Sequence, residues 1–426
     1  MTLSRRCFLF LTAVALACPA FTFAQPAVTN SSRVGIVGDS ITEQKLYSKF
    51  MECYLLASNG TPDVKCFQYG WSGETAGGFA GRLENDIAGF NPTIITLCYG
   101  MNDGGYQPYK DSIGQGYEGN MRNVLKKLEA FGVKTIVVGS PGAVDTKFFG
   151  TRPSFGTQNS AEGYNNTLAQ LRDIDKKLAA EHKQLFADVH AAMYDAMVKA
   201  KKVLGEDYDV CGRDGFHPGA NGQLAMAYAF LKGLGCEGNI GTITVDMKGK
   251  ATATDGHKVL ASAGGKVELE STRWPYCYDG DAKSSGGTRS ITPFLPFNQD
   301  LNRYVLKVTG LDAAKATVKW GAEAKQFTRE QLTAGINLTE EFSATPFDAE
   351  FAKLTAAVGN KQGFETTMIK SIITTFRSYP AEIKNDPEGQ QALAVLTKKL
   401  HTHQAKLDAD ARKTLVPVKH ELVITQ

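Results

Sequence analysis

Two segments far apart in the sequence carry a hydroxyl, an imidazole and a carboxylate that could act together in nucleophilic catalysis. Ser40 lies in the sequence GDSI (residues 38–41), directly after an apolar run, and Asp214 and His217 lie in DGFHP (residues 214–218). A serine hydroxyl is a weak nucleophile until a base removes its proton. A carboxylate three residues before a histidine on a turn can orient the imidazole, so that the other ring nitrogen can accept that proton.

Each segment alone has an ordinary structural explanation. A serine at a strand-to-helix turn commonly caps the helix, and aspartate and His-Pro pairs are common in turns. A third segment, GMND (residues 100–103), also reads as a turn by itself. Its Asn102, however, could donate a side-chain hydrogen bond to an oxyanion that develops during attack on a carbonyl. The three segments together, in this order, favour catalysis over chance.

These segments, with Gly73 in SGET (residues 72–75), resemble the SGNH (GDSL) hydrolase family in type and order, over residues 31–236. The resemblance implies that Ser40 is the nucleophile, that His217 is the general base and then acid, and that Asp214 orients it. It also implies that the N–H groups of Ser40 and Gly73 and the amide of Asn102 form the oxyanion hole. The family uses no metal and no cofactor, so none is expected.

The elements that position these residues are predicted from the apolar patterns. Short β-type runs occur at residues 34–37, 64–69, 93–98, 135–138 and 185–189, with helical patterns between them. Strands that alternate with helices predict a three-layer α/β/α sandwich with a five-stranded parallel sheet, which the resemblance describes as flavodoxin-like. In such a sheet, ligands bind beyond the carboxyl ends of the strands. The motifs fall at these positions.

The chain after residue 238 has a different pattern. Alternating runs at residues 241–247, 259–261, 266–271, 303–308 and 316–320 predict a small antiparallel β-sandwich. Two helical patterns, about 347–376 and 388–413, form a predicted hairpin insertion (about 347–413), and residues 416–424 return to the sandwich as a strand. The predicted second domain therefore spans residues 239–426, and it contains no motif that indicates chemistry.

The first 24 residues read as an export signal, because Arg5 and Arg6 precede an apolar run that ends in TFA (residues 22–24). The sequence SRRCFL (residues 4–9) resembles a twin-arginine signal, while a lipid anchor on Cys18 is the less favoured interpretation. We therefore expect a periplasmic or extracellular protein. Of its remaining cysteines, Cys211 and Cys236 bracket one predicted helix and are the candidate disulfide pair.

Charge and missing motifs exclude several classes of function. The chain has 47 Lys and Arg residues, two of them in the predicted signal, against 44 Asp and Glu residues. Such a balance indicates neither a nucleic-acid partner nor an anionic membrane, and no transmembrane segment is predicted. The chain lacks HExxH, GxSxG and the phosphate-binding loop, so a zinc hydrolase, an α/β-hydrolase and a P-loop enzyme are not supported.

The substrate is expected to be an ester, and three aromatic residues are candidates for its binding: Trp71, Tyr99 and Tyr106. Aromatic rings near the site can form a platform for a sugar or a wall for an acyl chain. A carbohydrate O-acyl (acetyl) esterase, acting on an acylated polysaccharide, is slightly favoured because no long apolar lid stands out. A lipase-like or lysophospholipase-like acylhydrolase, or a thioesterase, remains open. So does a non-catalytic glycan-binding module.

Overall fold

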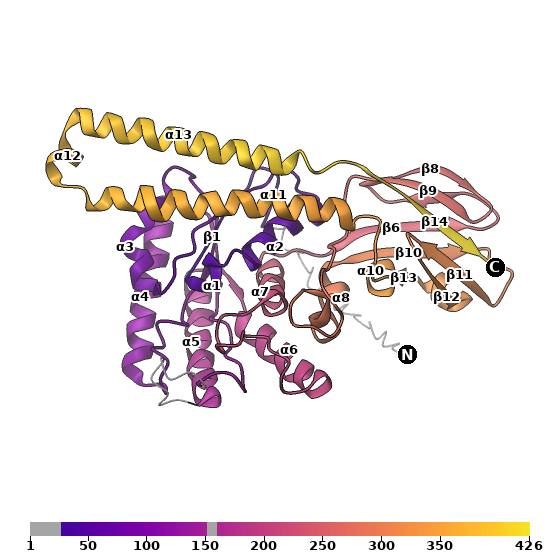
Figure 1. The fold of residues 1–426 in the computed structure, drawn as a ribbon, viewed down its shortest axis with the longest axis horizontal. Coiled ribbons are helices and arrows are strands. Elements are labelled where there is room, and N and C mark those ends of the chain that lie inside the picture. Colours follow the sequence, from indigo (N-terminus) through magenta and orange to yellow (C-terminus); the bar gives the residue numbers. More distant parts are fainter. Residues whose placement is uncertain (1–26, 151–159) are drawn as a thin grey trace, which may run out of the picture.

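The computed structural model of the protein describes residues 27–150 and 160–426. The predicted export signal at residues 1–24 lies outside this range. In Figure 1 the described chain has three parts: an α/β part, a β-rich part beside it, and two long helices that run antiparallel along one edge of the α/β part.

The α/β part contains a sheet of five parallel strands in the order β2-β1-β3-β4-β5. The strands are β1 (Arg33–Gly38), β2 (Lys65–Gln68), β3 (Ile94–Cys98), β4 (Thr135–Gly139) and β5 (Leu185–Ala187). Most of their side chains are buried on both faces, as expected for a parallel sheet between helices. The predicted fold class is confirmed, and each predicted strand is present within two residues.

Helices cover both faces of this sheet. The helices α3 (Ala76–Ile87), α4 (Asp111–Phe131) and α5 (Ala161–Glu181) pack side by side on one face. The other face is covered by α2 (Tyr47–Cys53), α6 (Val189–Leu204) and α7 (Ala220–Gly233). A one-turn helix, α1 (Ser40–Glu43), follows β1 directly, and therefore places Ser40 at the carboxyl edge of the sheet.

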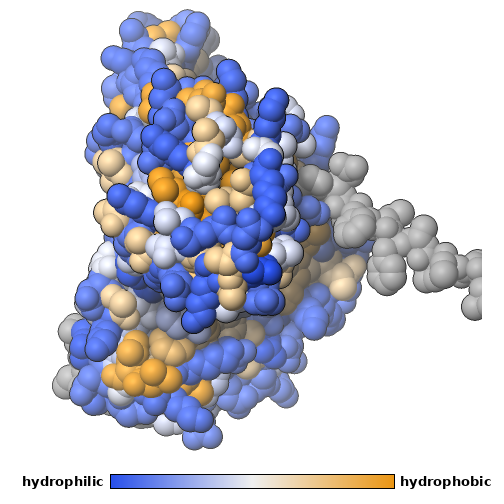
Figure 2. Space-filling model, turned by 90° about the vertical axis from the view of Figure 1, so that its right-hand side faces the viewer, coloured by the Kyte–Doolittle hydropathy of each residue, from blue (hydrophilic) through white to orange (hydrophobic). Residues whose placement is uncertain are grey.

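Two further sheets form the β-rich part. A four-stranded sheet has the order β13-β10-β6-β7, and a five-stranded sheet has the order β12-β11-β14-β9-β8. Their strands are β6 (Asn239–Asp246), β7 (Ala251–Ala253), β8 (His257–Ala263), β9 (Lys266–Ser271), β10 (Arg303–Thr309), β11 (Lys315–Trp320), β12 (Glu323–Thr328), β13 (Ile336–Asn337) and β14 (Val418–Thr425). Figure 2 shows this end of the molecule, whose surface is mainly hydrophilic with separate apolar patches.

The sequence-based description of this part needs two corrections. The sandwich is not wholly antiparallel, because β6 and β10 pair in parallel after the chain has crossed to the other sheet for β8 and β9. It also contains short helices, α8 (Phe297–Leu301), α9 (Arg329–Ala334) and α10 (Leu338–Glu341). Elements of four to six residues are too short to show a helical period, which explains why they were missed.

The helical hairpin lies between β13 and β14 in the chain. Its first arm is α11 (Asp348–Thr367), which continues through a π-helical turn, η4 (Met368–Ile373), and a 3₁₀ turn, η5 (Thr374–Ser378). After α12 (Ala381–Asn385), the second arm α13 (Pro387–Arg412) leads back to β14. In residues 27–150 and 160–426, no helix is both long and apolar enough to cross a membrane.

The hairpin packs against the parallel sheet, although it is inserted in the β-rich part (Figure 1). The Lys361 ammonium on α11 lies 2.9 Å from the Glu52 carboxylate, 2.8 Å from that of Glu365 and 2.7 Å from the carbonyl of Cys66. Glu365 also accepts a hydrogen bond from the backbone N–H of Gln68, at 3.0 Å. Because β2 is an edge strand, α11 satisfies a backbone donor that would otherwise be unpaired.

The candidate disulfide between Cys211 and Cys236 does not form, and all six cysteines of the described residues are free thiols. The two residues lie beyond opposite ends of α7, which has 14 residues. At 1.5 Å per residue this helix is about 21 Å long, whereas a disulfide requires Cα atoms within about 7 Å. Bracketing a whole helix therefore argues against a disulfide rather than for one.

A buried hydrogen-bond chain joins the two sheets of the β-rich part. His257 donates through Nε2 to the carbonyl of Ile240 at 3.0 Å and accepts from the Ser271 hydroxyl at 2.8 Å. Ser271 accepts from Nε2 of His420 at 2.9 Å, and Nδ1 of His420 accepts from the Trp320 indole at 3.3 Å. Both imidazoles are neutral in this network, because a further proton on either ring would have no acceptor.

We expect His420 to make stability depend on pH. Burial lowers its pKa to about 3, whereas the pKa in the unfolded chain is about 6.5. The contribution of His420 to the free energy of unfolding is complete above pH 6.5. It is lost as the pH falls toward 3, because in this range the imidazole binds a proton in the unfolded chain but not in the folded one. When the pH is lowered from 7 to 5, the free energy of unfolding, measured by denaturant titration, should fall by about 2 kcal/mol less in His420→Gln than in the wild type. His403→Gln, on the exposed face of α13, should follow the wild type; a parallel decline in all three proteins would contradict the prediction.

Candidate active site

The structure brings the three predicted residues of the triad together. Ser40 Oγ lies 2.8 Å from Nε2 of His217, and Nδ1 of His217 lies 2.7 Å from Oδ2 of Asp214. Ser40 is positioned by the end of β1, while Asp214 and His217 lie in the loop before α7. The His217 side chain is 28% exposed, so the site is open to solvent on one side. The arrangement can move a proton from the hydroxyl to the imidazole.

Hydrogen bonds within the short loop that carries Asp214 and His217 stabilise its conformation. Asp214 Oδ1 accepts the backbone N–H groups of His217 at 3.0 Å and Phe216 at 3.2 Å, which leaves Oδ2 for the imidazole. Burial raises the pKa of Asp214, but these hydrogen bonds and the His217 ring together hold it below its usual value. Gly215 has φ +91°, and a Cβ there would lie 2.4 Å from Phe149 Cα, so only glycine fits.

Asp145, which the sequence analysis missed, supports this loop. Its backbone N–H donates to the carbonyl of Gly215 at 2.7 Å, and its buried carboxylate lies 2.9 Å from the Lys201 ammonium. Asp145 follows β4, at the carboxyl edge of the sheet. The rule that ligand sites lie beyond the carboxyl ends of parallel strands could therefore have found it.

The two other predicted oxyanion donors lie in loops after β2 and β3. Gly73 is exposed, with φ +74°, in a turn closed by a hydrogen bond from Glu74 N–H to the Trp71 carbonyl. Asn102 Nδ2 donates to the Glu74 carbonyl at 3.0 Å, and its Oδ1 accepts from the Tyr106 hydroxyl at 2.9 Å. Because Tyr106 occupies the oxygen, the network fixes which end of the Asn102 amide carries the donors.

Two carboxyl groups, the buried Asp39 and the half-buried Asp103, support the loops around the site. Asp103 accepts the backbone N–H groups of Ala76 and Gly100, each at 3.0 Å, and so joins the loop after β2 to the loop after β3. Asp39 caps α1 by accepting the N–H of Ile41 at 2.9 Å. Burial raises the pKa of Asp39 to about 7 and that of Asp103 to about 6. Both groups therefore hold loop geometry rather than face the substrate.

The three candidate substrate-binding aromatic residues are placed differently. Trp71 and Tyr106 are partly exposed, and the Tyr106 ring packs 5.2 Å from that of Phe216, which lies 4.4 Å from the His217 ring. Tyr99 is only 1% exposed and donates its hydroxyl to Glu74 at 2.6 Å. The assignment of Tyr99 to substrate binding is therefore wrong, because its ring belongs to the core.

His190, the second residue of α6, lies outside the candidate active site. Its side chain is buried, and burial lowers its pKa to about 4. Among the described residues, no group of three or more His, Cys, Asp or Glu side chains is placed to hold a metal ion.

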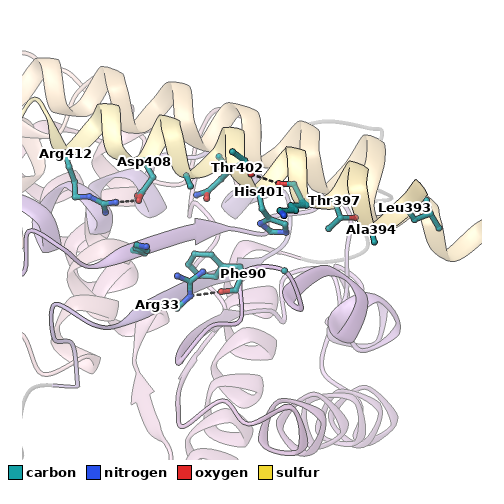
Figure 3. Close-up of a pocket in the computed structure, with 14 residues that line it drawn as sticks. Arg33, Phe90, Leu393, Ala394, Thr397, His401, Thr402, Asp408 and Arg412 are labelled. Atoms are coloured by element: carbon teal, nitrogen blue, oxygen red, sulfur yellow. Dashed lines mark hydrogen bonds and ion pairs between the residues drawn. The ribbon is translucent and has the colours of Figure 1, made fainter. Parts of the chain in front are cut away.

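A separate pocket of about 730 Å³ lies under α13 (Figure 3). His401 points from α13 toward Phe90, and Arg33 lies beneath them with its guanidinium 4.3 Å from the Phe90 ring. Arg33 and Lys65 begin β1 and β2, so the pocket lies at the amino edge of the sheet, whereas Ser40 lies at the carboxyl edge. The pocket is therefore not part of the candidate active site.

The α/β part of the chain is similar to known proteins. Residues 36–225 match the GDSL-like Lipase/Acylhydrolase family. An acetylxylan esterase from Geobacillus stearothermophilus is 25% identical over 181 residues, which are 41% of this chain and 74% of that enzyme.

A solved structure, that of a gut microbial diltiazem-metabolizing enzyme, extends the comparison to nearly the whole chain. It is 20% identical, with a TM-score of 0.71, and the alignment covers 95% of this chain and 99% of the other. At this identity the likeness shows the fold alone, including the β-rich part and the hairpin. The family match and the esterase relative together identify the α/β part of the chain as a serine ester hydrolase domain of the SGNH (GDSL) family.

Proposed function

We propose that the protein removes acyl groups, acetyl above all, from hydroxyl groups of carbohydrates through an acyl-enzyme on Ser40. The observation that carries the proposal is the continuous hydrogen-bond chain from Ser40 to Asp214, at 2.8 and 2.7 Å, in a partly open site. The acetylxylan esterase relative, 25% identical over the same domain, supports the choice of substrate class.

In the first step, His217 accepts the Ser40 proton while Oγ attacks the ester carbonyl carbon. The negative charge that develops on the carbonyl oxygen is stabilised by the N–H groups of Ser40 and Gly73 and by the Asn102 amide. The tetrahedral intermediate then collapses, the bond to the alcohol oxygen breaks, and His217 returns its proton to the departing sugar hydroxyl. Ser40 is left esterified by the acyl group.

In the second step, water replaces the alcohol. His217 accepts a proton from water, the resulting hydroxide attacks the acyl carbonyl, and the same three donors stabilise the second intermediate. Collapse releases the carboxylic acid and returns the proton to Ser40. Each step uses only groups of this chain and the substrate, and no proton is gained or lost at the triad over the cycle.

The surroundings of the triad suit an alcohol attached to a large glycan. Gly73 is exposed, and Trp71 and Tyr106, in the loops after β2 and β3, are partly exposed. Aromatic faces bind sugar rings well because they offer apolar surface with little conformational cost. The predicted export signal at residues 1–24 would place the enzyme with such polymers.

Substrate class is tested by measuring acetate release from acetylated xylan and xylo-oligosaccharides, beside p-nitrophenyl esters from acetate to laurate, a lysophospholipid and an acyl thioester. We expect acetate release from the glycan and a fall in kcat/KM of at least about tenfold from acetyl to octanoyl, as a small acyl site excludes longer chains. The Ser40→Ala variant measures the rate of hydrolysis that does not depend on Ser40. Rates that rise with acyl length, or turnover of the lysophospholipid or thioester but not the glycan, would contradict the proposal.

A further inference from the structure

The C-terminal hairpin reaches the loop that carries Gly73. The π-helical turn η4 continues α11 and carries Lys370, whose side chain is 27% exposed. π-helical turns within α-helices frequently occur at functional sites. Here the turn lies beside the loop after β2, hundreds of residues away in the sequence.

Lys370 contacts this loop through Glu43, the last residue of α1. Its ammonium lies 2.9 Å from Oε1 and 2.8 Å from Oε2 of Glu43. Oε2 of Glu43 also accepts the backbone N–H of Ser72, at 2.5 Å. One carboxylate therefore joins three segments: the helix that begins with Ser40, the loop of Gly73, and the hairpin.

Gly70 and Trp71, in the same loop, also pack closely against their neighbours. Trp71 donates its backbone N–H to the Gly38 carbonyl at 3.0 Å, and its ring lies 5.0 Å from the Lys370 ammonium and 5.1 Å from the Arg82 guanidinium. A Cβ on Gly70 would lie 2.2 Å from the Glu43 backbone nitrogen, so only glycine permits this approach to α1. Contacts with α1 and with the hairpin therefore fix the position of the loop that carries Gly73.

Charge makes this arrangement depend on Lys370. Partial burial raises the pKa of Glu43, but the hydrogen bonds from Lys370 and Ser72 outweigh burial and lower it. Without Lys370, the partly buried carboxylate loses its cation and keeps the Ser72 N–H. A charge left unpaired in this way moves toward water, and the Ser72 peptide moves with it.

We propose that Lys370 is a positioning residue for ester hydrolysis, which through Glu43 and Ser72 holds the next backbone N–H, that of Gly73, where the oxyanion forms. This inference rests on the proposed roles of Ser40 and Gly73, but not on the identity of the substrate. It makes the C-terminal hairpin a part of the catalytic machinery.

Lys370→Met tests the proposal, because methionine keeps most of the length of the unbranched side chain and removes the charge. Loss of one oxyanion donor lowers kcat about 10²- to 10³-fold. A displaced donor should cost less, so we expect kcat for p-nitrophenyl acetate to fall about tenfold. KM should change less than about twofold, and the acid limb of the pH profile should not shift, because the triad is untouched. Lys370→Arg should restore most of the activity.

Lys353→Met is the matched control. Lys353 lies on the exposed face of the same α11 and pairs with Glu350 at 2.7 Å, far from the loop of Gly73. Its kcat should equal that of the wild type. Partly exposed ion pairs contribute little to stability, so both variants should melt within about 3 °C of the wild type. A tenfold loss in Lys370→Met at unchanged Tm then reports position rather than unfolding.

A double-mutant cycle with Glu43→Gln tests the route of the effect. If Lys370 acts through Glu43, Lys370→Met should change kcat less than about twofold in the Glu43→Gln background. Unchanged kcat in the single variant, additive losses in the cycle, or a rise in KM alone would each overturn the proposal. Activity retained by Ser40→Ala would instead overturn the proposed function, so the two failures are distinguishable.

Discussion

Replacement of Ser40 by alanine is expected to lower kcat for ester hydrolysis by at least about 10⁴-fold, because removal of a triad nucleophile leaves only binding and the oxyanion donors to assist water. Steady-state hydrolysis of p-nitrophenyl acetate measures the loss. A fluorophosphonate, which forms a covalent bond with an activated serine, should add one adduct mass to the wild type and none to the variant.

The fold should not change in this variant, because the Ser40 hydroxyl contacts His217 at the surface end of α1 rather than the core. The melting temperature of Ser40→Ala should stay within about 3 °C of the wild type, as for most surface substitutions. Ser378→Ala, an exposed serine on the hairpin, is the matched control and should keep full activity. A Ser40→Ala variant that retains more than about a hundredth of the activity would exclude Ser40 as the nucleophile.

The parallel sheet and the triad could be predicted because their determinants are local. An apolar run of four to six residues, rich in β-branched side chains and bounded by turn residues, indicates a buried strand from local sequence alone. The side chains that follow such runs must meet at the carboxyl edge of the sheet, so Ser40 and Asn102 could be placed without coordinates. Asp214 and His217 are three residues apart, and their pairing required only a turn.

The docking of the hairpin could not be predicted from the same patterns. Charged residues on a helix, such as Lys361, Glu365 and Lys370, normally indicate a face in water. Here Lys361 and Glu365 are buried with Glu52, about 300 positions away, and Lys370 pairs with Glu43. A periodic pattern shows that a helix has a polar stripe, but it does not show that another segment carries the complementary charges.

Aromatic residues near the site show the same limit. Tyr99 and Tyr106 lie in one segment after β3, and their types and positions do not distinguish them. The structure places the Tyr99 hydroxyl on Glu74 within the core and the Tyr106 hydroxyl on Asn102 at the site. The difference arises from Glu74, which lies on another loop and is itself held by Arg82.

Asp214→Asn should lower kcat by about 10³- to 10⁴-fold, because it stabilises the tautomer of His217 that carries its proton on Nε2. The structure determines which way the new amide points. The backbone N–H groups of Phe216 and His217 donate to Oδ1 of Asp214, so the asparagine oxygen must take that position. Its NH₂ group then replaces Oδ2 and faces Nδ1 of His217. The imidazole accepts there, carries its proton on Nε2, and cannot accept the proton of Ser40.

The control for this change is Asp207→Asn. The Asp207 carboxylate is exposed and pairs with Lys147 at 2.7 Å, so its loss should leave kcat unchanged. KM of Asp214→Asn should stay within about threefold of the wild type, because Asp214 orients His217 and does not bind substrate. Because the pKa of Asp214 lies below its usual value, its carboxylate is charged at the neutral pH at which the two enzymes are compared. Activity within about tenfold of the wild type would therefore show that His217 is oriented by another group.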